Sequence, residues 1–219
     1  MINITRAGTS LNESLRLQMQ VFSESERSDR IEQLLESERR KVVSLDNCLI
    51  CRRGSQIAGV LLLVSQSDGT VYVWPAETHG GLHPDDDSEI RRALYAEAAR
   101  VVDSPGNWIG QSLLETDQEE QSHELADNGF PRLTDLVFLN RSVLQDDEDS
   151  VSSDTSNSEP WTSEPFDEAA NGSDFAALVE QTYESTCDCP ELNGSRNGWE
   201  SLESHRQAGS HSPDLWRLF

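Results

Sequence analysis

Apolar and polar positions along the first 140 residues repeat with the periods of strands and helices, and they predict a mixed α/β domain. Alternation or a short apolar run indicates a strand, and apolar residues three and four positions apart indicate a helix. One apolar run, residues 57–64, is apolar on both faces, as in a central strand. The predicted strands in the first half are 2–7, 47–52, 57–64 and 71–74, and the predicted helices are 11–22 and 31–40.

The pattern continues after a strong turn signal at Asp68-Gly69. A helix is predicted over 88–102, with Asp87 or Ser88 as its N-cap. A second helix over 117–128 is predicted to begin with a capping box and to end before a glycine in the C′ position. The remaining predicted strands are 108–114 and 133–139, which gives the order β, α, α, β, β, β, α, β, α, β.

The character of the chain changes after this last strand. The chain has 40 acidic and 17 basic residues and a net charge of −23, and ten of those acids lie between Val143 and Asp174, where no base occurs. Such a segment buries too little apolar surface to offset its ordering entropy, so we expect an acidic, Ser-rich disordered linker over 144–173. It separates a first domain, 1–143, from a segment over 174–219 in which a helix is predicted from about Phe175.

Charge and hydropathy exclude several classes of function. A chain this acidic is repelled by phosphate backbones and by anionic lipid surfaces, so we expect neither nucleic acid nor membrane as a partner. No apolar run reaches the 18 residues of a membrane span, and the N-terminus lacks the pattern of a signal peptide. We therefore expect a cytoplasmic protein whose four cysteines are thiols.

The order of elements resembles a known fold. A three-strand meander before a helix, with the segment ADNGF before a last strand, resembles the GNAT acetyltransferases over residues 1–143. The stretch T-x-D-x-P-x-L-N-G-x-R at 186–196 resembles the start of the second domain in bacterial tandem-GNAT proteins. The resemblance implies a mixed, mostly antiparallel sheet flanked by helices, and residues 174–219 would be the N-terminal fragment of a second such domain.

The resemblance also implies acetyl-CoA as co-substrate and an amine as acceptor. In that family a splayed strand meets the pantetheine, which here points to Val73 and Trp74, and a loop offers amides to the pyrophosphate, which points to Gly80 and Gly81. Backbone N–H groups at a helix N-terminus attract phosphate, and glycine allows close approach. Three aspartates at 85–87 oppose this, because they would repel a pyrophosphate, so we expect a degenerate first module.

Candidate catalytic residues follow from the same resemblance. Glu77, beside the strand end, could be the general base, and His123 could replace the tyrosine acid that the late helix lacks. Each has a structural alternative, a loop acid and a solvated helix face. Tyr72 and Trp74 could line a substrate cleft or belong to the core.

In the second segment, Asp188, Asn193 and Arg196 are the candidates for a substrate-binding loop, with a structural turn at Asn193-Gly194 as the alternative. No metal site is predicted, because Cys48 and Cys51 lie inside a predicted strand and the Cys187/Cys189 pair is far away in the chain. His79 and His83 have helical spacing but lie in a Gly- and Pro-containing loop.

We therefore predict an N-acyltransferase of the GNAT type that moves an acetyl group from acetyl-CoA to a small-molecule or peptide amine, with a degenerate first module. The alternative is a non-catalytic GNAT-like scaffold that packs on a second GNAT domain or on a partner chain. A third possibility, an acidic interaction protein acting through the linker, has only composition behind it.

Overall fold

The computed structural model describes residues 2–66, 69–106, 109–136, 162–184, 197–207 and 212–218. The chain forms two compact units, Met1–Arg132 and Leu133–Phe219. The first contains the mixed α/β architecture that the sequence predicts. Across the described ranges, none of the helices combines the length and the apolarity that a bilayer span requires.

The strands of the first unit form two four-stranded groups. One has the order β1 (Ile4–Arg6), β3 (Leu49–Arg53), β4 (Gln56–Leu61), β7 (Glu77–Thr78); the other has the order β2 (Val43–Ser44), β5 (Leu63–Gln66), β6 (Thr70–Val73), β8 (Ile109–Gln111). Only Leu62 separates β4 from β5. The pairings are antiparallel except that β6 and β8 are parallel, as a helical crossover between them requires.

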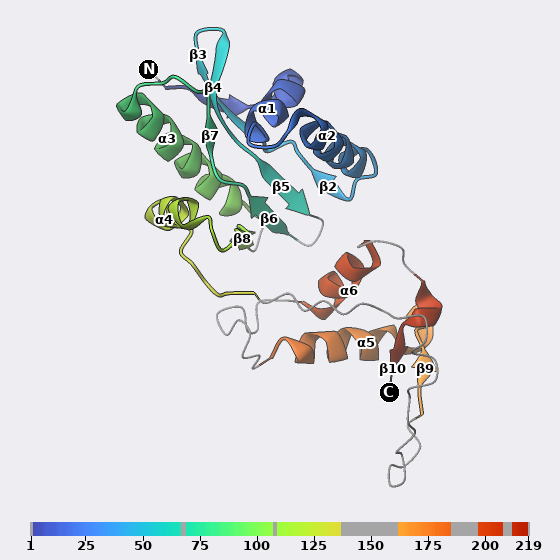
Figure 1. Ribbon diagram of the computed structural model, residues 1–219. Coiled ribbons are helices and arrows are strands. Elements are labelled where there is room, and N and C mark those ends of the chain that lie inside the picture. The colour runs from blue at the N-terminus through green and yellow to red at the C-terminus, as the bar shows by residue number, and fades with distance from the viewer. Residues whose placement is uncertain are drawn as a thin grey trace, which may run out of the picture. The chain divides into compact units, whose positions relative to one another are not determined.

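Helices cover both faces of these strands (Figure 1). The helices α1 (Leu11–Gln18) and α2 (Glu24–Arg39) lie on one face, and α3 (Pro84–Val102) lies on the other with α4 (Glu119–Asp127) beside it. Each face has its own apolar cluster: Leu15 and Met19 of the α1 segment pack with Val60 and Leu62, whereas Leu94 of α3 packs with Leu61 and Val71. The alternating side chains of the central strands therefore feed two cores.

Several predicted boundaries are wrong, and the reasons are local. The helix predicted over 31–40 begins at Glu24, because Ser23 and Glu26 form a capping box. The helix predicted from Ser88 begins at Pro84 with His83 as N-cap, and proline suits the first helical position. The helix predicted over 117–128 begins at Glu119, and the predicted capping box is absent, because its N-cap Gln118 makes no side-chain cap bond.

The other differences concern strands. The structure adds the two-residue strands β2 and β7, which are too short to leave a periodic pattern. Of the strand predicted over 133–139, residues 133–136 are not a strand in the structure. The other residues of that prediction, 137–139, lie outside the described ranges. The predicted C′ glycine of α4 is confirmed, because Gly129 has φ 94°.

The second unit is a small assembly of its own. It has a two-stranded ribbon of β9 (Glu164–Pro165) and β10 (Arg217–Leu218) and two helices, α5 (Glu168–Thr182) and α6 (Gly198–Gln207). Its core is aromatic: the ring centroid of Phe166 lies 5.0 Å from that of Phe175 and 5.4 Å from that of Trp216. The helix predicted around Phe175 is confirmed. Most of the predicted linker lies outside the described residues, and the predicted domain boundaries stay predictions.

Candidate functional site

The strand pair that would carry a cofactor site contains a break. Between β5 and β6, Leu63 pairs with Val73, but between β4 and β7, Val60 pairs with Glu77, so the register shifts by one residue. The extra residue lies between Val73 and Glu77, which makes this segment a β-bulge. Strand β8 pairs with β6 only as far as Tyr72. The bulge therefore begins just after the point where β6 and β8 stop pairing.

Side chains from both helical layers take up the backbone polar groups of the bulge. From α1, Gln18 donates from Nε2 to the carbonyl oxygen of Pro75 at 2.8 Å and accepts the N–H of Leu62 at 2.9 Å. From α3, the Tyr95 hydroxyl accepts the N–H of Ala76 at 2.9 Å, and Arg91 Nη1 donates to the Ala76 carbonyl oxygen. The chain itself therefore satisfies these four backbone groups.

Arg91 is the centre of a polar cluster on the α3 side of the bulge. Its Nε donates to Asp87 Oδ2 at 2.9 Å, and its Nη1 lies 3.4 Å from Glu124 Oε2 on α4. Its Nη2 donates to Thr78 Oγ1 at 3.2 Å, and that hydroxyl also donates to Asp87. Burial raises the pKa of Glu124 above its usual range, although Arg91 opposes this effect. The cluster ties α3, α4 and β7 together.

The opposite face of the bulge carries Glu77. Gln20, which follows α1, donates from Nε2 to Glu77 Oε2 at 2.9 Å and to the Thr78 carbonyl oxygen at 3.1 Å. Burial raises the pKa of Glu77, and the Gln20 hydrogen bond and the Arg91 charge oppose the rise. Tyr72 and Trp74 pack against the apolar cluster on this same α1/α2 face. The structure thus places three of the predicted site residues on one face, where Tyr72 and Trp74 belong to the apolar core, as the structural alternative predicts.

The loop before α3 contains the two glycines predicted to face a pyrophosphate, and it is followed by acidic residues. Gly81 has φ 90°, and a Cβ at Gly80 or Gly81 would meet no heavy atom within 4 Å. All three aspartates lie in the first turn of α3. Asp86 pairs with Arg53 at 2.8 Å, and Asp87 pairs with Arg91. The expectation that acids occupy this helix start is met, although the helix begins four residues earlier than predicted.

The other predicted site residues do not converge with these. Val73 is buried in the α3-side core. His123 is exposed on α4, on the α3 side of the strands, whereas Glu77 faces α1. The candidate substrate residues Asp188, Asn193 and Arg196 lie outside the described residues.

The cysteine and histidine pairs do not form a metal site in the described part of the chain. No group of three or more His, Cys, Asp or Glu side chains there could hold a metal ion. Cys48 and Cys51 are buried free thiols, and burial raises the pKa of Cys48 to about 12. His79 Nδ1 bonds the neighbouring Gly80 carbonyl, and His83 caps α3. Cys187 and Cys189 lie outside the described residues.

Sequence reasoning missed the side chains that close the bulge: Gln18, Gln20, Arg91, Tyr95 and Glu124. The pairing of Arg91 with Asp87 had a readable signal, because they are four residues apart on a predicted helix. No such signal exists for Gln18, whose partners lie 44 and 57 residues away in the chain, or for Tyr95, whose partner lies 19 residues away.

No protein-family model and no curated protein sequence matches this chain. Solved structures that resemble it include a possible acetyltransferase from Clostridium difficile 630, with 9% identity, a TM-score of 0.49, and coverage of 66% of this chain and 99% of that one. The aminoglycoside antibiotic 6'-N-acetyltransferase AAC(6')-IG from Acinetobacter haemolyticus matches with 16% identity and a TM-score of 0.45, covering 64% and 99%. AAC(6')-Iy, in complex with a CoA bisubstrate analogue, matches with 12% identity and a TM-score of 0.45, covering 65% and 99%.

Proposed function

We propose that the chain belongs to an N-acyltransferase of the GNAT type as a degenerate module, whose N-terminal unit does not itself bind acetyl-CoA. The arrangement that supports a common origin is the meander, the bulge after β6, the α3 crossover and the parallel β8. Acetylation of a small-molecule or peptide amine would then depend on a second domain or a partner chain, on which the N-terminal unit packs.

The observation that carries the degenerate assignment is the occupied bulge. The strand backbone that would meet a pantetheine already bonds Gln18, Tyr95 and Arg91. A ligand would have to displace buried side chains and leave their polar atoms without partners, at about 1–3 kcal/mol for each lost group. The residues present therefore do not fit the cofactor.

Charge at the start of α3 works in the same direction. A carboxylate about 4 Å from a phosphate charge costs roughly 4 kcal/mol at an effective dielectric constant near 20. That energy corresponds to about a thousandfold in affinity. Because Asp86 and Asp87 are each neutralised in part by an arginine, Asp85 retains the largest uncompensated charge near the loop.

Calorimetric titration of acetyl-CoA into the chain tests this proposal. We expect no saturable heat up to about 1 mM ligand, because both the backbone donors and the helix start are blocked. The Asp85→Asn/Asp86→Asn variant, which leaves the Asp87–Arg91 pair intact, should bind more tightly than the natural chain if charge is part of the block. Micromolar binding by the natural chain, abolished by bulky residues at Gly80 and Gly81, would overturn the proposal.

One observation favours a second candidate, an active N-terminal unit. Glu77 shares the α1/α2 face with Tyr72 and Trp74, and a carboxylate whose pKa is raised by burial is a better proton acceptor near neutral pH. In that case Glu77 would take the proton from the acceptor amine. Acetylation of an amine panel by the chain, lost in Glu77→Gln, would support this candidate.

A further inference from the structure

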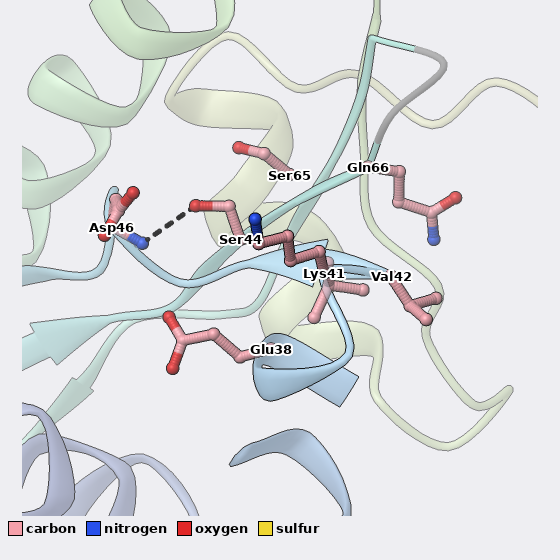
Figure 2. Close-up of a pocket in the computed structure, with 8 residues that line it drawn as sticks. Glu38, Lys41, Val42, Ser44, Asp46, Ser65 and Gln66 are labelled. Atoms are coloured by element: carbon pink, nitrogen blue, oxygen red, sulfur yellow. Dashed lines mark hydrogen bonds between the residues drawn. The ribbon is translucent and has the colours of Figure 1, made fainter. Parts of the chain in front are cut away.

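A solvent-open cavity of about 390 Å³ lies between the end of α2 and the strands β2 and β5, and Lys41 and Asp46 are exposed there. Besides two valines, the described residues that line it are polar (Figure 2): Glu38, Lys41, Ser44, Asp46, Ser65 and Gln66. Its volume lies in the range of small-molecule sites. Ser65 and Gln66 form the far end of β5 from Leu62, so the cavity is separate from the bulge.

Lys41 has an unusual backbone position in this cavity. Its N–H bonds the Glu38 carbonyl at 2.8 Å, and the N–H of Val42 bonds the Ser37 carbonyl at 3.0 Å, which is the Schellman pattern at the end of α2. Lys41 is the C′ residue of this motif and has φ 58°, the one positive φ of a non-glycine residue within the described ranges. Glycine usually fills this position, because a side chain there is strained.

The same residue is the only lysine of the chain. The other 16 of its 17 basic residues are arginines. A side chain kept in a strained conformation points to a role beyond folding. Lys41 lines the cavity, and in the described part of the chain its ammonium group has neither an ion pair nor a hydrogen bond.

Opposite charges in the cavity are also left without partners. The carboxylate of Asp46 has no hydrogen bond or ion pair with the described residues, and that of Glu38 accepts a single bond, from the N–H of Leu45 at 3.3 Å. In Figure 2 the side-chain ends of Glu38 and Asp46 lie on one side of the cavity and that of Gln66 lies on the other. The hydroxyl oxygens of Ser44 and Ser65 each accept one bond, which leaves their protons free to donate.

We propose that this cavity binds a small zwitterion of the basic α-amino acid class, whose carboxylate pairs with Lys41 and whose α-ammonium and cationic side-chain groups pair with Glu38 and Asp46. Two acids against one base give the described lining residues a net charge of −1, which a ligand of charge +1 complements. The two carboxylates would repel a simple anion, and the lysine would repel a simple cation. None of the lining residues that the structure describes is aromatic, so they offer no ring on which a flat ligand could stack.

The sole lysine makes the direct test simple. Reductive methylation with ¹³C-formaldehyde keeps its charge and labels one side chain, apart from the N-terminal amine. We expect L-lysine and L-arginine to shift the Lys41 signal saturably at millimolar or lower concentration, and calorimetry on the unmodified chain to give the same affinity. Cadaverine, which lacks the carboxylate, should bind at least about tenfold more weakly.

Three variants separate a binding role from a structural one. Lys41→Gly keeps the left-handed turn and removes the ammonium group, so it should abolish L-lysine binding while leaving thermal stability equal or higher. Glu38→Gln should weaken binding by about tenfold. Its matched control is Glu36→Gln, which removes a carboxylate on the same helix that pairs with Arg39 outside the cavity and should change nothing.

Three outcomes would overturn the proposal. The first is the absence of a saturable shift of the Lys41 signal up to about 10 mM L-lysine or L-arginine. Binding weaker than this would not count as specific. The second is unchanged binding in Lys41→Gly. The third is equal affinity for cadaverine, which would mean that the cavity only attracts cations.

Discussion

Tyr95→Phe tests whether helix side chains hold the bulge in place. Tyr95 is fully buried, and its hydroxyl accepts the N–H of Ala76 from across the α3-side core. Phenylalanine fills the same volume, so the packing loss is small and the main change is one buried N–H without a partner. Such a group costs about 1–3 kcal/mol.

The matched variant acts from the other face. Gln18 is 4% exposed and satisfies two backbone groups, the N–H of Leu62 and the carbonyl of Pro75. Gln18→Met keeps the length of the side chain and leaves both groups unpaired. The expected loss is therefore about twice that of Tyr95→Phe, roughly 2–6 kcal/mol.

Urea unfolding followed by far-UV circular dichroism measures both losses. Amide hydrogen exchange then locates them: Tyr95→Phe should speed exchange at Ala76 by about 5- to 150-fold, and Gln18→Met should act first at Leu62. The control is Tyr183→Phe, which removes a tyrosine hydroxyl from the second unit, 3.4 Å from His205 Nε2, and should leave both amides unchanged. A Tyr95→Phe loss below about 0.5 kcal/mol would refute the reasoning, because an unpaired buried N–H cannot be that cheap.

Three further predictions concern other parts of the chain. Ser23→Ala breaks the capping box of α2 and should cost about 1 kcal/mol in urea unfolding, whereas no loss would contradict the role of the cap. Folding raises the pKa of Glu77 above its ordinary value of 4.5, so the folded chain binds more protons than the unfolded chain, and the contribution of Glu77 to stability falls as the pH rises above about 4.5. The stability of Glu77→Gln relative to the natural chain should therefore increase with pH. A decrease would contradict this. Gly198→Ala places a Cβ inside the van der Waals radius of the Ala176 carbonyl oxygen, so α6 must move away from α5 and the protection of α6 amides should drop; unchanged protection would refute the close contact.

The parts of the fold that the sequence predicts are those with short-range causes. The Leu15 and Met19 stripe of the first helix is buried as its spacing predicts, and Gly129 takes the left-handed position expected after α4. The start of α2 also has a readable signal, the Ser23–Glu26 capping box. The apolar pattern misses it because the first half of this helix is charged and only Ile31 is buried, so the pattern begins seven residues late.

The candidate site was predictable only in part, for a different reason. Tyr72, Trp74 and Glu77 are close in sequence, and alternation along a strand places the first two on one face. The one-residue bulge then returns Glu77 to that same face, which alternation alone does not predict. The partners of the bulge come from α1 and α3, and nothing near Gln18 or Tyr95 in the sequence indicates that their polar atoms will meet a strand break.

The bulge and the start of α3 together explain why internal partners and a cofactor exclude each other. A buried backbone N–H or carbonyl that pairs only with a ligand destabilises the free protein, because it has no hydrogen-bond partner until the ligand binds. Here Gln18, Tyr95 and Arg91 provide these backbone groups with hydrogen-bond partners. The helix dipole and the Arg91 charge both stabilise the Asp87 carboxylate. Each of these contacts stabilises the free unit and opposes a pyrophosphate or a pantetheine by the same interaction. Under the proposed function, such a unit gains stability by losing the cofactor site, as expected for a module that packs against another domain or a partner chain.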